Sequence, residues 1–214
     1  MQTTVLIDYG SGNLHSAEKA LAAAAKASGT DARIVVTSDP AAVLAADRLV
    51  LPGVGAFAAC MGALESKDGL IEALNEAVRH KASPFLGICV GMQLLATRGL
   101  EFGETPGLGW IPGDVRKLQP ADRALKIPHM GWNALQSETG HPLLAHAPDG
   151  AHVYFTHSFV LDPEDKADAI AWTDHGGPIV AAVARGNIAG VQFHPEKSQA
   201  VGLRLLGDFL EWRP

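Results

Sequence analysis

The sequence is poor in cysteine, in aromatic residues and in basic clusters, and these shortages exclude several classes of protein. Its two cysteines, Cys60 and Cys89, are too few for a disulfide framework, which indicates a reducing compartment. The formal net charge of −6 and the lack of any basic run argue against nucleic-acid binding. No apolar run is long enough to cross a bilayer, and the first residues follow a strand pattern instead of a signal-peptide pattern. We therefore expect a cytosolic protein that contacts neither nucleic acid nor membrane.

Hydrophobic residues are nevertheless abundant, and in the first half of the chain they alternate between strand and helix patterns. They make up 47% of the 214 residues, whereas aromatics account for 6%, so we expect a core built mainly from Ala, Val and Leu. Short apolar runs predict strands at 5–7, 33–36, 49–51 and 85–88, and helical patterns occur at 13–27, after Pro40 and at 69–81. Continuous apolar strands that alternate with helices predict an α/β fold, with a parallel sheet covered on both faces.

The second half of the chain changes character, because its strand patterns follow one another with short links. Strands are expected at 115–118, 153–155, 169–172 and 179–183, and a hairpin turn at 185–187 leads into another strand at 188–193. A helix over 200–212 closes the chain. These strands predict antiparallel additions to the sheet. We find no linker or internal repeat and expect a single domain over residues 1–214.

The segment Gly87-Ile88-Cys89-Val90-Gly91 carries the strongest chemical signal. A small reactive residue between two glycines, at a strand-to-helix turn, is the arrangement of a nucleophile elbow. The glycines permit a sharp turn and a close backbone approach, because neither has a Cβ atom. Residues 92–96 predict the first turns of the helix that follows, and unpaired N–H groups at the start of this helix favour the thiolate form of Cys89. The alternative is a buried cysteine that only fills space in the core.

A second motif, Phe193-His194-Pro195-Glu196-Lys197, supplies what a cysteine nucleophile needs. His194 can accept and return a proton, and Glu196 can fix the imidazole tautomer and stabilise its charged form. The cysteine, the histidine and the carboxylate together favour an acyl-transfer triad. The remaining histidines lack the spacing of metal ligands, and no Cys-x-x-Cys is present, so we expect no metal.

Further candidates for the site lie near these motifs. The tetrahedral oxyanion of acyl transfer needs preorganised donors, and the N–H groups of Val54 and Val90 are the candidates. Gln93, one helical turn after the cysteine, could bind a polar substrate, and the carboxylate of Glu101 could hold a substrate ammonium. Each could also be an ordinary turn or surface residue. Segment 52–57, the cysteine and the histidine follow predicted strands, and ligands bind at the carboxyl ends of such strands.

The motifs together resemble the class I (triad) glutamine amidotransferases, and more closely the glutaminase subunits of imidazole glycerol phosphate synthases. The resemblance covers nearly the whole chain. It rests on segments 8–14, 52–57, 87–93, 128–133, 154–159 and 194–198. It implies a flavodoxin-like fold, with a central, mostly parallel sheet, helices on both faces and antiparallel additions in the C-terminal half.

The resemblance also implies an activity, a partner and roles for single residues. The chain would hydrolyse L-glutamine and deliver ammonia to a (β/α)8-barrel cyclase, which forms imidazole glycerol phosphate and an aminoimidazole carboxamide ribotide in histidine biosynthesis. Glutaminase and cyclase would form a heterodimer, and no metal or organic cofactor is required. The implied roles are Cys89, His194 and Glu196 as the triad, Gly55, Gln93, Glu101 and Ser158 for glutamine, and Asn13, Trp132 and Lys197 toward the cyclase.

Three other interpretations stay open. The chain could be the glutaminase of another class I system, of the pyridoxal phosphate synthase or anthranilate synthase type, although segments 52–57 and 128–133 argue against this. It could be a non-catalytic binding module on the same fold, which the intact Cys-His-Glu set disfavours. It could also be a cysteine hydrolase that acts alone. A glutamyl thioester trapped on Cys89 would separate this last interpretation from an amidotransferase.

The oxyanion segment also suggests how the site is regulated. A Gly53-Val54 peptide can turn over with little steric cost, because glycine tolerates positive φ. We expect the N–H of Val54 to point away from the site at rest and to turn inward when the loaded cyclase docks.

Overall fold

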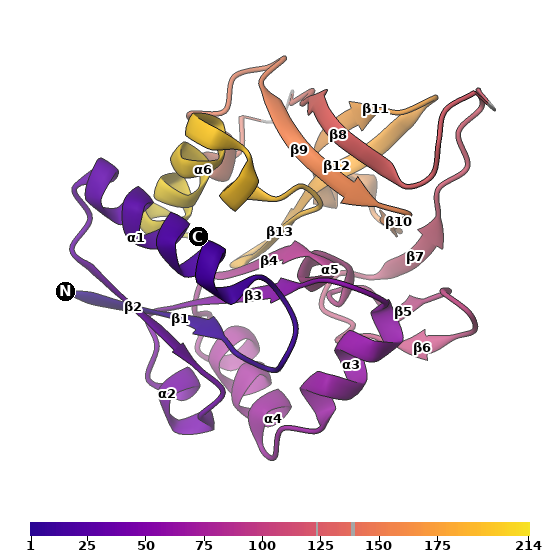
Figure 1. The fold of residues 1–214 in the computed structure, drawn as a ribbon. Coiled ribbons are helices and arrows are strands. Elements are labelled where there is room, and N and C mark those ends of the chain that lie inside the picture. Colours follow the sequence, from indigo (N-terminus) through magenta and orange to yellow (C-terminus); the bar gives the residue numbers. More distant parts are fainter. Residues whose placement is uncertain (123, 138–139) are drawn as a thin grey trace.

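The structure is a computed structural model that describes residues 1–122, 124–137 and 140–214. The centre of these residues is a seven-stranded sheet with the strand order β11-β12-β13-β4-β3-β1-β2 (Figure 1). Its strands are β1 Gln2–Ile7, β2 Ala32–Thr37, β3 Arg48–Gly53, β4 Phe85–Cys89, β11 Ala169–Asp174, β12 Pro178–Arg185 and β13 Ile188–Val191. The strands β2, β1, β3, β4 and β13 pair in parallel, whereas β12 pairs antiparallel with β13 and β11. The predicted fold class, including the antiparallel additions, is confirmed.

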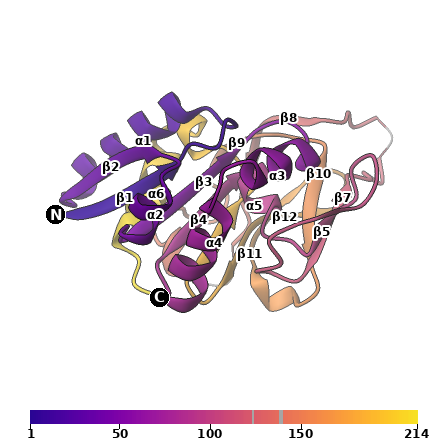
Figure 2. The same cartoon turned by 90° about the horizontal axis from the view of Figure 1, so that it is seen from below.

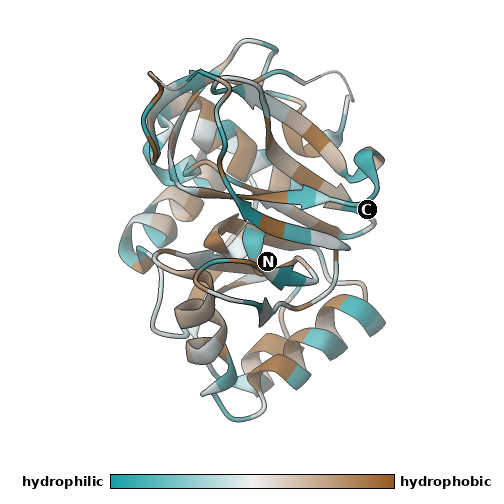
Figure 3. Ribbon diagram, turned by 90° about the vertical axis from the view of Figure 1, so that its right-hand side faces the viewer, coloured by the Kyte–Doolittle hydropathy of each residue, from teal (hydrophilic) through white to brown (hydrophobic). Residues whose placement is uncertain are grey.

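Helices cover the sheet on both faces, as the alternating pattern predicts (Figure 1). Helices α1 (Leu14–Ser28) and α6 (Gln199–Glu211) pack together on one face, and α2 (Pro40–Leu44), α3 (Phe57–Glu65) and α4 (Leu70–Asn75) lie on the other. The helices carry both hydrophobic and hydrophilic residues (Figure 3), because only one side of each faces the sheet. None of the helices in the described ranges is long and apolar enough to cross a membrane.

Two smaller sheets extend the molecule beyond the central one. One has the order β10-β7-β5-β6, with β10 Phe159–Pro163, β7 Gly113–Lys117, β5 Arg98–Gly99 and β6 Thr105–Pro106. It lies at the end of the molecule opposite β1 and β2 (Figures 1 and 2). The other is an antiparallel ribbon of β8 (His129–Ala134) and β9 (His152–His157). Short turns complete the chain: a π-helical turn at Glu76–His80 and 3-10 turns at Pro142–Leu144, Lys166–Asp168 and Pro195–Lys197.

The helix expected after Cys89 is wrong in length, because α5 (Val90–Gln93) makes a single turn. The carbonyl groups that a longer helix would use are occupied by a distant segment. The N–H of Leu108 donates to Leu94 O at 2.8 Å, and the N–H of Gly109 donates to Ala96 O at 2.9 Å. Gly107 lets this segment approach, since a Cβ atom there would lie 2.2 Å from Ala96 O. The strand expected to reach residue 193 ends at Val191, so the two residues before His194 belong to a connection.

Candidate active site

Cys89 ends β4 in a strained backbone conformation. Its φ is +55° and its ψ is −112°, a region that residues with a side chain rarely adopt. The flanking glycines make the turn possible. A Cβ atom on Gly87 would lie 2.4 Å from Gly91 O, and a Cβ atom on Gly91 would lie 1.9 Å from Leu51 O. The elbow expected from the sequence is thus present, and it aims Cys89 at the carboxyl ends of the strands.

His194 and Glu196 are paired beside the cysteine. Nδ1 of His194 lies 2.8 Å from Oε1 of Glu196, and both side chains are almost fully buried. Nε2 of His194 is buried and makes no hydrogen bond within the described residues, so the nitrogen opposite the carboxylate is free to exchange a proton. Burial alone would lower the pKa of His194, but interactions with Cys89 and Glu196 outweigh it and raise the pKa to about 9. The histidine is therefore charged at neutral pH.

Backbone contacts to β9 hold the histidine in place. The N–H of His194 donates to Tyr154 O at 2.9 Å, and the hydroxyl of Ser198 donates to His194 O at 2.7 Å. The same hydroxyl accepts the N–H of Tyr154 at 3.0 Å. Because these bonds join the turn after β13 to the ribbon, the position of the imidazole depends on the position of β9.

A pocket of about 430 Å³ collects most of the residues singled out from the sequence. Its volume suits a small polar ligand such as an amino acid. The lining includes the following predicted residues: Val54, Gly55, Cys89, Val90, Gln93, Glu101, Ser158, His194 and Lys197. The lining also includes Pro128, Thr156, His157 and Phe159. Three predicted residues are not part of the lining: Glu196, which lies behind His194, and Asn13 and Trp132, which are exposed.

Gln93 is buried at the pocket wall, and its amide hydrogens are already in use. Its Nε2 donates to Phe159 O and to Oε1 of Gln192, each at 3.0 Å. Oε1 of Gln93 remains as an acceptor for a ligand. Gln192 in turn directs its Nε2 toward Sγ of Cys89 at 3.7 Å. Gln192 is not among the residues singled out from the sequence, although its position two residues before His194 is a signal that points to it.

Glu101 lies on the loop between β5 and β6, and one of its oxygens is engaged. Oε2 accepts the N–H of Phe57 at 2.8 Å, where α3 begins. Oε1 has no hydrogen-bond partner among the described residues, and Glu101 lines the pocket together with Gln93. Two acceptor oxygens at one wall suit a ligand ammonium group.

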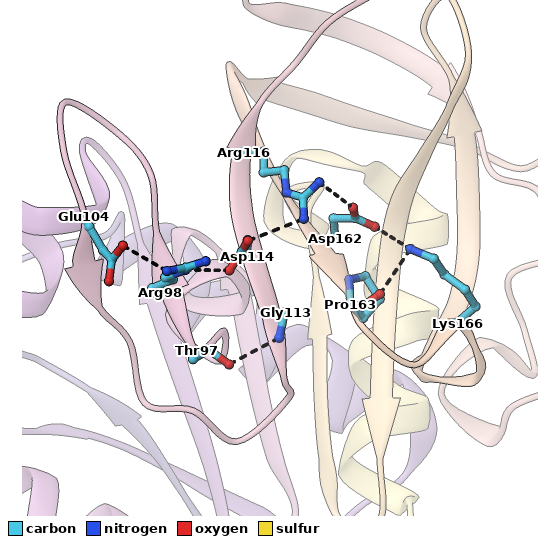
Figure 4. Close-up of polar contacts among 9 residues, drawn as sticks. All are labelled: Thr97, Arg98, Glu104, Gly113, Asp114, Arg116, Asp162, Pro163 and Lys166. Carbon is cyan, nitrogen blue, oxygen red and sulfur yellow. Dashed lines mark hydrogen bonds and ion pairs between the residues drawn. The ribbon is translucent and has the colours of Figure 1, made fainter.

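A ladder of ion pairs braces this loop (Figure 4). Arg98 on β5 contacts Glu104 at 2.9 Å on the far side of the loop and Asp114 on β7 at 2.9 Å. Arg116 continues the ladder from Asp114 to Asp162 on β10, each at 3.4 Å. Exposed pairs stabilise a fold little, but here they join the loop that carries Glu101 to the small sheet.

The two candidate oxyanion donors differ in their contacts. Val90 is the first residue of α5, so its N–H has no partner within that helix. The N–H of Val54 donates to the hydroxyl of Ser11 at 3.2 Å. This N–H is thus engaged with the loop after β1.

A buried histidine pair lies beside the pocket. Nδ1 of His157 lies 2.9 Å from Phe159 O, and Nε2 of His157 lies 3.0 Å from Nδ1 of His129. A carbonyl can only accept, so His157 carries its proton on Nδ1, and its Nε2 accepts a hydrogen bond from the Nδ1–H group of His129. Nε2 of His129 then accepts from the side-chain amide of Asn133 at 3.2 Å. Burial lowers the pKa of both histidines to about 4. No group of three or more His, Cys, Asp or Glu side chains is arranged to hold a metal in the part of the chain that the structure describes.

The residues assigned to a partner interface lie on an exposed surface near the pocket. Trp132 on β8 is 48% exposed and stacks edge-to-face with Tyr154, with ring centroids 6.0 Å apart. Nζ of Lys197 lies 5.6 Å from the centre of the same Tyr154 ring. Asn13 is also exposed, and its side chain accepts the N–H of Ser16 at the start of α1.

Comparison with known proteins identifies the family. The model of the class-I glutamine amidotransferase family matches residues 5–211. The chain belongs to the class-I glutamine amidotransferase family. It is 62% identical to the imidazole glycerol phosphate synthase subunit HisH of Caulobacter vibrioides, over 100% of both chains. It is 59% identical to the subunit of the same name from Rhodospirillum rubrum, over 98% of both chains. The resemblance seen in the sequence is thus confirmed.

Solved structures agree with this assignment at the level of the fold. A crystal structure of a glutamine amidotransferase matches with a TM-score of 0.70 and 19% identity over 97% of both chains. A glutamine amidotransferase from Thermotoga maritima matches with a TM-score of 0.60 and 17% identity, over 91% of this chain and 76% of its own. At such identities the likeness shows the fold alone.

Proposed function

We propose that this amidotransferase is the glutaminase subunit of an imidazole glycerol phosphate synthase, which hydrolyses L-glutamine through Cys89, His194 and Glu196. The observation that carries the proposal is the strained Cys89 next to a buried His194–Glu196 pair. Their pocket is also lined by Glu101 and Gln93, whose Oε1 atoms have no partner among the described residues. Relatives named as the HisH subunit of that synthase match the chain from end to end.

Glutamine binding follows from the polar groups of the pocket. Oε1 of Gln93 and Oε1 of Glu101 accept hydrogen bonds from the α-ammonium group of glutamine. Gly55, which follows β3, and Ser158, between β9 and β10, also line the pocket and contact the rest of the substrate. The side-chain amide of the bound substrate glutamine then lies beside Sγ of Cys89.

The first half of the reaction forms a covalent intermediate. Sγ of Cys89 attacks the side-chain amide carbon, and the N–H of Val90 stabilises the oxyanion that develops. Charged His194 gives its Nε2 proton to the departing nitrogen, the carbon–nitrogen bond breaks, and ammonia leaves. Glu196 stabilises the imidazolium before the transfer and keeps the ring oriented afterwards. The product on the enzyme is a glutamyl thioester.

The second half regenerates the enzyme. Neutral His194 removes a proton from water, and the hydroxide attacks the thioester carbon. The carbon–sulfur bond breaks, glutamate leaves, and the thiolate of Cys89 and the imidazolium of His194 are restored.

The ammonia would pass to a (β/α)8-barrel cyclase bound as a heterodimer. The names of the relatives describe a subunit of a synthase, which supports a partner. Exposed Trp132 and Lys197 contact the half-buried ring of Tyr154 beside the pocket, which supports docking at this surface. Asn13, also exposed, lines a small cavity together with His194 and Glu196.

We further propose that residues 1–214 form one domain, because the central sheet contains strands from both ends of the chain. A cytosolic location is supported by the low cysteine content, which suits a reducing compartment.

An ammonia-release assay tests the proposal. The chain is incubated with glutamine alone, with its cognate cyclase, and with the cyclase and its ribotide substrate. We expect rapid ammonia release only in the last mixture, coupled one-to-one to formation of imidazole glycerol phosphate. A cysteine hydrolase that acts alone would give the same rate in all three, and the glutaminase of another system would show no response to this cyclase.

A further inference from the structure

Gln192 is a fully buried polar side chain that contacts both the nucleophile and the wall of the pocket. Its Oε1 accepts an N–H of Gln93 at 3.0 Å, and its Nε2 is directed at Sγ of Cys89 at 3.7 Å. Its backbone N–H donates to Ala181 O on β12 at 2.8 Å, which fixes the residue to the central sheet. Gln192 is not part of the pocket lining, so it acts on a ligand only through its neighbours.

The orientation of both side-chain amides follows from one backbone carbonyl. Phe159 O can only accept, and it receives Nε2 of Gln93 at 3.0 Å and Nδ1 of His157 at 2.9 Å. Gln93 therefore turns its NH2 group to this carbonyl. The second hydrogen of that NH2 group points at Gln192, so the atom of Gln192 that faces it is the oxygen. The NH2 group of Gln192 is then directed at Cys89.

The contact with Gln192 decides which end of the Gln93 amide faces the pocket. Because its NH2 group is held by two acceptors, Gln93 presents Oε1, which accepts a hydrogen bond from a ligand ammonium group. If this amide alone turned over, its oxygen would face Phe159 O and Oε1 of Gln192. If both amides turned over, Oε1 of Gln192 would face the thiolate of Cys89. Each alternative places two acceptors against each other.

The other end of Gln192 supports the nucleophile. A hydrogen bond to the charged form of a group favours that form, and bonds to charged groups are stronger than neutral ones. The N–H of Gln192 thus favours the thiolate of Cys89. A side-chain amide does not titrate, so this donor is present at every working pH, whereas His194 donates only while it is charged.

We infer that Gln192 is a positioning residue that turns the oxygen of Gln93 toward the substrate ammonium group and stabilises the thiolate of Cys89. One buried amide thereby joins the binding of glutamine to the state of the nucleophile. This inference rests on the proposed glutaminase activity. It adds a residue that the triad, the pocket lining and the partner surface do not include.

The test replaces Gln192 by methionine, which has a similar length but no amide. In the complex with loaded cyclase, we expect KM for glutamine to rise roughly tenfold and kcat to fall roughly fivefold, the effect of about one lost hydrogen bond at each contact. The preference in kcat/KM for glutamine over glutaramate, which lacks the α-ammonium group, should narrow roughly tenfold. The orientation of Gln93 matters only for that group, whereas a packing defect would slow both substrates equally.

The effect on the nucleophile is measured separately. In the isolated chain, alkylation of Cys89 by iodoacetamide at pH 7, followed by mass spectrometry of its peptide, should be roughly fivefold slower in Gln192→Met, because less thiolate forms. Asn187→Ala is the matched control. Asn187 lies at the amino end of β13, and its side-chain amide donates to Val78 O at 2.8 Å and Ser83 O at 2.9 Å. This variant should change neither the preference for glutamine nor the alkylation rate.

A second measurement keeps residue 192 intact and covers the case in which Gln192→Met does not fold. In chains labelled with 15N in the glutamine side chains, the NH2 resonances of Gln192 should move in Cys89→Ala and stay in Cys60→Ala. Unmoved Gln192 resonances, or an unchanged preference or alkylation rate in folded Gln192→Met, overturn the inference. Absence of ammonia release from the wild-type complex, with the alkylation rates as expected, would instead overturn the proposed function.

Discussion

At the scale of single residues, the chemistry depends on a few atoms with constrained surroundings. Cys89 is held at positive φ by glycines that no other residue could replace without a backbone clash. His194 has Glu196 on one nitrogen, and its second nitrogen has no hydrogen-bond partner in the part of the chain that the structure describes. These constraints give each side chain a separate role, and single substitutions separate the roles.

The nucleophile is tested by Cys89→Ala. Glutamine-dependent synthesis by the complex should fall on the order of a thousandfold or more, because no other thiol lines the described pocket. Synthesis with added ammonium salts should stay near the wild-type rate, since the cyclase needs only ammonia. Both rates are measured as formation of imidazole glycerol phosphate. Glutamine-driven activity near wild type would refute the assignment of Cys89.

The orienting pair is tested by two substitutions in the glutaminase assay. His194→Ala should lower kcat on the order of a thousandfold or more, because the proton carrier is lost. Glu196→Gln should be milder, roughly a hundredfold, since the amide still orients the ring but no longer stabilises its charge. The pKa of His194, raised to about 9 by Cys89 and Glu196 against the effect of burial, should fall in Glu196→Gln. A larger loss in Glu196→Gln than in His194→Ala would show that the roles are wrong.

At the scale of elements, the ribbon of β8 and β9 connects the exposed surface to the pocket. Trp132 and Tyr154 lie on its outer side, while His129 and His157 form a buried chain that ends at the carbonyl of Phe159. Each nitrogen in this chain has one role, donor or acceptor. An added proton would place two donors against each other, which explains why the chain is neutral.

The histidine chain makes stability depend on pH. Burial lowers the pKa of His129 and His157 to about 4, below the value of about 6.5 in the unfolded chain. The unfolded state therefore binds more protons below pH 6.5, and the free energy of unfolding should fall as the pH drops from 6.5 toward 4. His129→Gln should reduce this loss by about 1 to 2 kcal/mol between pH 6.5 and pH 5, measured by denaturant unfolding. Parallel pH curves for the two proteins would contradict the prediction.

At the scale of the whole molecule, the sheet edge, the ribbon and the small sheet meet around one pocket. The proposed triad comes from β4 and the turn after β13, and the proposed ammonium site comes from α5 and the loop after β5. The surface with Trp132 and Lys197 borders the same pocket. A partner that docks there would contact a residue next to Glu196, which couples docking to the triad.

Lys197→Ala tests this coupling. A salt bridge from Lys197 to an acidic residue of the cyclase would tie the interface to the triad, so its loss should lower the ratio of complex to free glutaminase activity roughly fivefold. Lys26→Ala, near the end of α1, is the matched control and should leave the ratio unchanged. A ratio in Lys197→Ala equal to that in the control would show that Lys197 is only a solvated charge.

The sequence by itself determined the alternation of strands and helices, the elbow at Cys89 and the Cys-His-Glu set. Local signals carry these features: apolar runs mark buried strands, glycines mark the sharp turn, and His194-Pro195-Glu196 is a continuous motif. The error in the length of α5 arises because segment 107–111 takes the carbonyl groups of residues 94–96. That contact is tertiary, and no local sequence pattern predicts it.

Only the tertiary structure decided which donors and acceptors of the site are already hydrogen-bonded to other protein groups. From the sequence alone, the side chain of Gln93 could donate or accept a hydrogen bond, and the N–H of Val54 has no assigned partner. In the fold, Gln93 donates both amide hydrogens to other protein groups, and the N–H of Val54 donates to Ser11. Hydrogen-bond partners are chosen by distance and direction, between residues 43 to 99 positions apart in the chain. Residue types and spacing limit the possible chemistry, whereas the geometry assigns each donor to its acceptor.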